Sequence, residues 1–206
     1  VNLTEAELNT VDGTNIANVQ IGEPTGQDGD ITVDDSTNDG VLSFNRTNLV
    51  LNVNGTAALS QTAGGELDLT GNGGGHTLQV NGGGAGTTLR ADIRTGGGTV
   101  TIDDAVTLGG NVAIDTDPTD PGAGATITID SASGGGTIDG TFRMDFDAGT
   151  GGNVVIDGAV GGGTAVERLW VSEADTVTLA AVTTGDDGGG PADTIDITAG
   201  GAISLS

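Results

Sequence analysis

Carboxylates are the side chains of this sequence best suited to chemistry. The 206-residue chain has 29 Asp and Glu against five Arg and no Lys, which gives a formal charge of -24. Ca²⁺ prefers several hard oxygen ligands held in loops. Many Asp residues stand in turn-like segments, and we predict that the Ca²⁺ ligands come from Asp28, Asp30, Asp34, Asp115, Asp117, Asp120, Asp186, Asp187 and Asp193. The sequence requires no cofactor, and Ca²⁺ is the ion that these Asp residues would bind.

The spacing of these Asp residues leaves a second interpretation open. None of them has the spacing of an EF-hand loop. Residues 188–196 approach the Gly-Gly-x-Gly-x-Asp-x-apolar-x calcium repeat, but Pro191 replaces a Gly and no second copy follows. Asp is also a common turn residue in its own right. Diffuse screening by cations is therefore the alternative to specific binding.

A second set of carboxylates suggests catalysis on polysaccharides. Asp103, Asp130 and Asp157 recur at a constant interval, and each follows an alternating apolar run. Paired carboxylates about 5–10 Å apart can serve as acid and base in glycoside hydrolysis. A sugar groove normally adds aromatic platforms and cationic partners, whereas this chain has one histidine, His76, and one tryptophan, Trp170, which we expect in the core or at a corner. We expect no enzymatic activity and keep a polysaccharide-active enzyme as the alternative.

Two further motifs, a series of Thr-x-Thr pairs and the glycosylation acceptor pattern, are weaker indications of function. Thr-x-Thr pairs recur at 99/101, 126/128 and 176/178, but Asn153 and Val155 break the ladder that an ice-binding face needs. Threonine is a good strand residue on any solvated face. Asn2, Asn45 and Asn54 match the glycosylation acceptor pattern.

The charge and composition exclude several partners. Phosphate groups of nucleic acids and of anionic membranes are repelled by such an acidic chain, so its charge predicts cations as partners. There is no Cys, which excludes disulfides and thiolate metal sites, and no apolar run long enough for membrane insertion. The chain starts at Val1, so we expect any targeting signal to be removed or to lie outside this sequence.

These carboxylates must be positioned by short strands. Alternation of apolar and polar residues over four to six positions is typical of a strand with one buried face. Such runs occupy residues 30–33, 66–69, 99–103, 111–115, 126–130, 153–157, 176–179 and 193–197. Clusters of Gly, Asp and Asn separate them, which favours tight corners and disfavours helices.

The period of the best-matched runs predicts the fold. The step in residue number from Ile102 to Ile129 is 27, the step from Ile129 to Ile156 is again 27, and each Ile is followed by Asp. A fixed period of roughly 20–50 residues indicates stacked repeats. We therefore predict an all-β parallel β-helix (β-solenoid) of about eight coils over residues 23–206, with residues 1–22 as an N-terminal cap or lead-in strand. A β-sandwich is the alternative architecture.

The two ends of such a stack differ in sequence. Thr4–Glu7 has the form of a capping box and predicts a short N-terminal capping helix. Residues 200–206 stop within an alternating run, so we expect the C-terminal end to be uncapped. This end would stack head to tail on another subunit or meet neighbouring repeats of the same chain.

Residues 152–171, followed by 176–179 and 199–204, resemble the Gly/Thr-rich β-strand repeats of bacterial surface proteins. These are the filamentous-haemagglutinin-like and autotransporter-passenger adhesins. The resemblance implies a right-handed parallel β-helix, secretion, and a role as a stalk, adhesin or matrix fibre. We therefore expect a structural module of an extracellular or cell-surface fibre; a calcium-binding surface-layer module is a further alternative.

Overall fold

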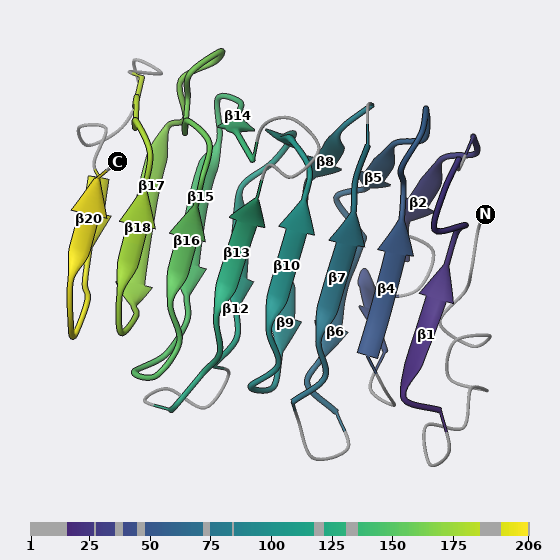
Figure 1. The fold of residues 1–206 in the computed structure, drawn as a ribbon, viewed down its shortest axis with the longest axis horizontal. Helices are drawn as coiled ribbons and strands as arrows, with labels where there is room; N and C mark the ends of the chain where they lie inside the picture. The colour runs from purple at the N-terminus through teal and green to yellow at the C-terminus, as the bar shows by residue number, and fades with distance from the viewer. Residues whose placement is uncertain are drawn as a thin grey trace.

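The computed structural model of the chain is an all-β solenoid of stacked parallel strands (Figure 1). It describes residues 16–26, 28–35, 39–44, 48–71, 75–83, 85–117, 122–130, 136–185 and 195–205, and none of these is helical. The predicted capping helix at Thr4–Glu7 lies outside the described residues. The parallel β-helix is confirmed, and the β-sandwich alternative is wrong, because all of the strand pairs described are parallel.

The strands form three sheets, one on each side of the coil. Sheet A contains β1 (Asn18–Ile21), β4 (Asn48–Asn52), β7 (Leu78–Asn81), β10 (Val100–Asp103), β13 (Ile127–Asp130), β16 (Val154–Ile156), β18 (Val177–Leu179) and β20 (Ile203–Leu205). Sheet B contains β2 (Ile31–Val33), β5 (Leu59–Gln61), β8 (Thr87–Leu89), β11 (Val106–Leu108) and β14 (Ile138–Asp139). Sheet C contains β3 (Val41–Ser43), β6 (Glu66–Leu69), β9 (Ile93–Thr95), β12 (Val112–Asp115), β15 (Arg143–Asp147), β17 (Arg168–Glu173) and β19 (Ile195–Ile197).

The predicted period holds in the middle of sheet A. Ile102 pairs with Ile129, and Ile129 pairs with Ile156. Elsewhere the step between partners changes, since it is 29 from Leu49 to Leu78 and 22 from Leu78 to Val100. Among the described residues, sheet A has eight strands, sheet B five and sheet C seven, so fewer than eight of the described coils have a strand on all three sides.

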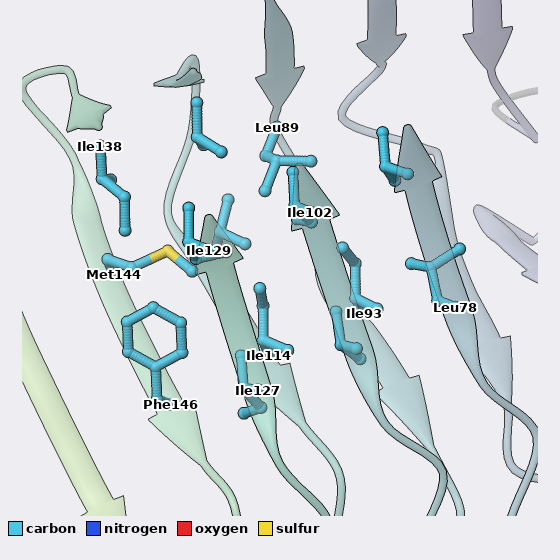
Figure 2. Close-up of a cluster of buried hydrophobic side chains, with 14 of the residues drawn as sticks. Leu78, Leu89, Ile93, Ile102, Ile114, Ile127, Ile129, Ile138, Met144 and Phe146 are labelled. Atoms are coloured by element: carbon cyan, nitrogen blue, oxygen red, sulfur yellow. The ribbon is translucent and has the colours of Figure 1, made fainter. Parts of the chain in front are cut away.

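A narrow aliphatic core fills the inside of the coils. Alternate residues of the strands point inward and are buried, and Figure 2 shows Ile102, Ile129 and their neighbours stacked along the solenoid. Met144 and Phe146 of β15 are also buried in this core. Aliphatic side chains suffice here because each inward residue packs on its counterparts one coil before and one coil after.

Glycine is required where adjacent corners come into contact. Gly124 has a φ of 56°, and a Cβ at this position would overlap the carbonyl of Ala148 in the next coil. A Cβ at Gly98 would likewise overlap the carbonyl of His76. The Gly clusters of the sequence therefore allow the coils to stack at the strand spacing.

Candidate functional site

Three carboxylates from successive coils meet where the chain leaves sheet C. Asp117 follows β12, Asp147 ends β15 and Glu173 ends β17, and one oxygen from each lies within 4.8 Å of the others. We call these three residues the acidic corner. Asp117 is buried, while Asp147 and Glu173 are half-buried.

Strand register and one irregularity build this corner. Asp115 pairs with Asp147 in sheet C, which brings Asp117 close to the same column. Between β15 and β17 the register shifts after Phe146, so that Glu173 pairs with Asp147. The extra residue, Ser172, donates its hydroxyl to Asp147 Oδ2 at 2.9 Å and to the Phe146 carbonyl at 3.1 Å. The β-bulge thus turns Glu173 toward the other two carboxylates.

Backbone donors fix the corner in place. The amide of Gly149 donates to Asp147 Oδ1 at 3.1 Å, and the amide of Gly122 donates to Asp117 Oδ2. A Cβ at Gly122 would overlap the Asp117 carboxylate, so a side chain at this position would displace that carboxylate. Three ionised carboxylates at this distance repel one another, and a hard cation would relieve the repulsion.

Asp115 borders the acidic corner and is electrostatically coupled to it. Its Oδ1 accepts the amide of Asp117 at 2.7 Å. Burial raises the pKa of Asp115 above its usual 3.8, the charges of Asp147 and Asp117 add to this rise, and the hydrogen bond from the Asp117 amide and the charge of Arg94 offset only part of it. The ionised form of this carboxylate is therefore disfavoured unless positive charge is supplied nearby.

The Asp residues predicted as calcium ligands divide into three groups. Asp117 belongs to the acidic corner, and Asp115 borders it. Asp28, Asp30 and Asp34 accept hydrogen bonds from the following coil: the Thr56 hydroxyl at 3.4 Å, the Ala58 amide at 2.9 Å and the Thr62 hydroxyl at 2.7 Å. These three tie each loop to the next coil, and they are not in the group of three acidic ligands found in the described part of the chain. Asp120, Asp186, Asp187 and Asp193 lie outside the described residues.

The sequence prediction missed Asp147 and Glu173. Their residue numbers exceed that of Asp115 by 32 and 58, and neither step is a multiple of the period seen in sheet A. Alternation within residues 143–147 and 168–173 would have assigned both to the end of a strand. Their convergence depends on the loop lengths and on the bulge, which alternation does not reveal.

The stacked carboxylates of sheet A lie on its outer face. Asp103 pairs with Asp130, as their spacing in the sequence predicted. The same face carries Thr101 opposite Thr128, followed by Val155, so the Thr ladder breaks where the sequence indicated. No histidine or aromatic residue lies on β10, β13 or β16. The column offers carboxylates without the platform that a sugar site needs.

Trp170 lies on the outside of sheet C, which corrects its predicted place in the core or at a corner. The ring is 37% exposed because Leu169 and Val171 on either side point inward. The Arg168 guanidinium stacks over it, with Cζ 4.9 Å from the ring centroid, and pairs with Asp145 at 2.6 Å. The ring therefore contributes to a surface network of charged groups.

Of the three glycosylation candidates, Asn54 lies among the residues that the structure describes. Its side-chain amide donates to the carbonyls of Glu23 at 3.3 Å and Pro24 at 2.6 Å, so it links two coils. Asn2 and Asn45 lie outside the described residues.

A second buried carboxylate occurs at Asp104, on the corner between sheets A and B. It accepts the Thr87 hydroxyl at 2.8 Å and the Ala105 amide at 2.9 Å, and it is 5% exposed. Burial raises the pKa of Asp104 above 3.8, more than these two hydrogen bonds lower it. Burial also raises the pKa of Glu66 above 4.5.

We predict that mild acidification stabilises the fold. A carboxyl whose pKa is higher in the folded state disfavours folding while it is ionised. Stability should therefore rise as the pH falls from neutrality through the raised pKa of Asp104, and the gain should be complete below about 3.8. Urea unfolding monitored by circular dichroism between pH 7 and pH 4 measures the effect. Asp104→Asn should be more stable than the wild type at pH 7 and should depend less on pH; a steady loss of stability on acidification of both proteins would contradict this.

Fold and site together define the class of the molecule: an acidic, three-sided parallel β-solenoid with an aliphatic core. Comparison with protein families, with curated proteins and with solved structures finds no match to the chain. Among the described residues, no helix has the length and apolar character needed to cross a membrane.

Proposed function

We propose that the chain is a rigid, acidic spacer of an extracellular fibre or adhesin, and that it has no catalytic role. The observation that carries this proposal is the continuity of sheet A from β1 to β20 around one aliphatic core. Eight strands at the spacing of a β-sheet span about 34 Å. Such a stack resists bending because every coil hydrogen-bonds to its neighbours along its strands.

The surface of the solenoid supports this role. The formal charge of -24 opposes lateral aggregation of neighbouring rods, and cations would lower this repulsion. Asp28, Asp30 and Asp34 clamp one coil to the next, so part of the acidic surface also stiffens the stack. The resemblance to the repeats of bacterial surface adhesins favours a location at the cell exterior.

Two measurements test the spacer proposal. Dyes attached to Gln20→Cys and Ser204→Cys, on the outer faces of β1 and β20, should report one narrow distance of about 34 Å by single-molecule energy transfer. An antibody to the purified chain should label intact cells of the source organism as strongly as permeabilised ones. A broad distance distribution would contradict the rigid rod, and labelling only after permeabilisation would contradict the extracellular location.

We also propose that the acidic corner binds Ca²⁺ and thereby joins three successive coils. Three carboxylates from three coils within 4.8 Å are the observation that favours this. Ca²⁺ accepts such hard oxygen ligands, and binding to the folded state alone raises its stability.

The melting temperature should therefore rise more in CaCl₂ than in NaCl of equal ionic strength. Asp147→Asn should lose this excess, and in the absence of Ca²⁺ it should melt higher than the wild type because one of three like charges is removed. Asp157→Asn is the matched control, since Asp157 is exposed and lies outside the acidic corner, and it should keep the excess. Equal shifts in CaCl₂ and NaCl would reduce the effect to ionic screening.

A further inference from the structure

Two asparagines of the described chain are followed directly by glycine, and the fold gives them different surroundings. They are Asn54, before Gly55, and Asn81, before Gly82. An Asn side chain is thermolabile because the next backbone nitrogen can attack its amide carbon. Glycine favours this attack, since it has no Cβ to hinder the approach. The structure therefore decides which of the two pairs can react.

Asn54 lies in a corner, where no strand holds its backbone. The corner connects β4 to β5, and Gly55 is exposed with a φ of 82°. Among the hydrogen bonds of the described residues, none is made by the backbone amide of Gly55. The attacking nitrogen of this pair is thus accessible to water and is not held by a carbonyl.

Asn81 is held in a strand on both sides. It is the last residue of β7 and pairs with Asn52 of β4 and with Asp103 of β10. Gly82 is buried, and its amide donates to the Asp103 carbonyl at 2.8 Å. The extended backbone of a strand keeps the side-chain carbon away from the next nitrogen, so the strand ladder must open before a ring can close.

The side-chain amide of Asn54 also fastens one coil to another. Its Nδ2 donates to the carbonyl of Glu23 at 3.3 Å and to that of Pro24 at 2.6 Å. Both acceptors lie in the corner that follows β1, one coil before Asn54. Loss of Nδ2 would remove both donors and leave carboxylate oxygen facing two carbonyl oxygens, which repel it.

We propose that Asn54 is a site of spontaneous deamidation, and that the reaction unfastens residues 22–26 from the following coil. The backbone nitrogen of Gly55 loses its proton to water and forms a bond to Cγ of Asn54. The bond from Cγ to Nδ2 breaks, ammonia leaves, and a five-membered succinimide remains. Water then opens this ring at either carbonyl and gives Asp or isoaspartate at position 54.

Peptide mapping by mass spectrometry tests the site. The folded chain is kept at mildly alkaline pH and sampled over time, and the same is done in urea. In the folded chain Asn54 should deamidate at least about tenfold faster than Asn81, because the strand and its hydrogen bonds must open at Asn81 first. In urea the two rates should become similar, since both residues precede glycine.

Hydrogen exchange tests the consequence for the fold. Asn54→Asp carries one of the two products, and amides of β1 and β2, on either side of residues 22–26, should exchange about 2–10-fold faster than in the wild type. Amides of residues 100–156 should be unchanged. Wild-type chain in which Asn54 has deamidated should show the same difference, which keeps the test valid if the variant folds poorly.

Asn111→Asp is the matched control. It adds the same charge, but Asn111 uses its Oδ1 to accept the Arg143 amide at 3.2 Å, and a carboxylate can accept the same bond. Exchange in β1 and β2 should therefore stay as in the wild type. Asn54→Gln is expected to remain unmodified at position 54, because its longer side chain does not form the five-membered ring.

Three results would overturn the inference. Equal rates at Asn54 and Asn81 in the folded chain would show that the fold does not select the site. An Asn54 that reacts in urea but not in the folded chain would show that its hydrogen bonds protect it. Unchanged exchange in Asn54→Asp would show that the amide does not fasten the corner. None of these results affects the spacer proposal, which depends on the distance measured within one chain.

Discussion

Replacement of Ile129 by Ala is expected to lower the free energy of unfolding by about 2–5 kcal/mol. Ile129 is fully buried and lies between Ile102 and Ile156 in the middle of the stack. The coils above and below are held at the strand spacing by hydrogen bonds, so the neighbouring side chains cannot close the cavity. The cost should therefore lie toward the upper part of this range, measured by urea unfolding.

Thr128→Ala is the matched control for this prediction. Thr128 precedes Ile129 on the same strand and faces outward, opposite Thr101 and Val155. A surface substitution of this kind changes stability by about 0.5 kcal/mol or less. Similar losses in the two variants would mean that the inward and outward faces of β13 are not distinct, and would contradict the solenoid core.

The central part of the fold could be predicted from the sequence because its coils have equal lengths. Residues 100–156 contain three sheet A strands at a constant interval, so Ile102, Ile129 and Ile156 fall on one inward column. Outside this region the loops lengthen or shorten, and the step between paired residues changes. Alternation still predicted individual strands there, but it could not predict which strands are neighbours.

The acidic corner could be predicted only in part. Asp115 and Asp117 could be predicted as Ca²⁺ ligands because they lie close together in the sequence. Asp147 and Glu173 join them through strand register and the bulge at Ser172, which are properties of three coils together. A single coil carries no information about the length of the next.

The misplacement of Trp170 has a simpler cause. Its size suggested a buried or corner position, yet the alternation in residues 168–173 already assigns it to the outer face, since Leu169 and Val171 are inward. In a narrow solenoid, strand parity decides burial more strongly than residue size does. Phe146, the other aromatic residue on a described strand, follows this rule, because it is inward on β15 and buried.

Deletion of residues 127–153 is expected to leave a folded protein that is one coil shorter. This segment contains β13, β14 and β15, one strand from each sheet. Its removal lets β16 pair with β10, with Val154 opposite Val100 and Ile156 opposite Ile102, so every inward residue again meets an inward residue. The far-ultraviolet circular dichroism per residue should be unchanged.

Such tolerance follows from contacts that are confined to adjacent coils. Stability in a stacked array is the sum of terms for each coil and for each interface, so losing one coil weakens the whole without destroying it. The urea m-value, which scales with the surface exposed on unfolding, should fall by roughly an eighth. The distance between dyes at positions 20 and 204 should shorten by about 4.8 Å, one strand spacing. A globular core shared by all strands would lose cooperative unfolding instead, and that result would contradict the solenoid and with it the proposed spacer.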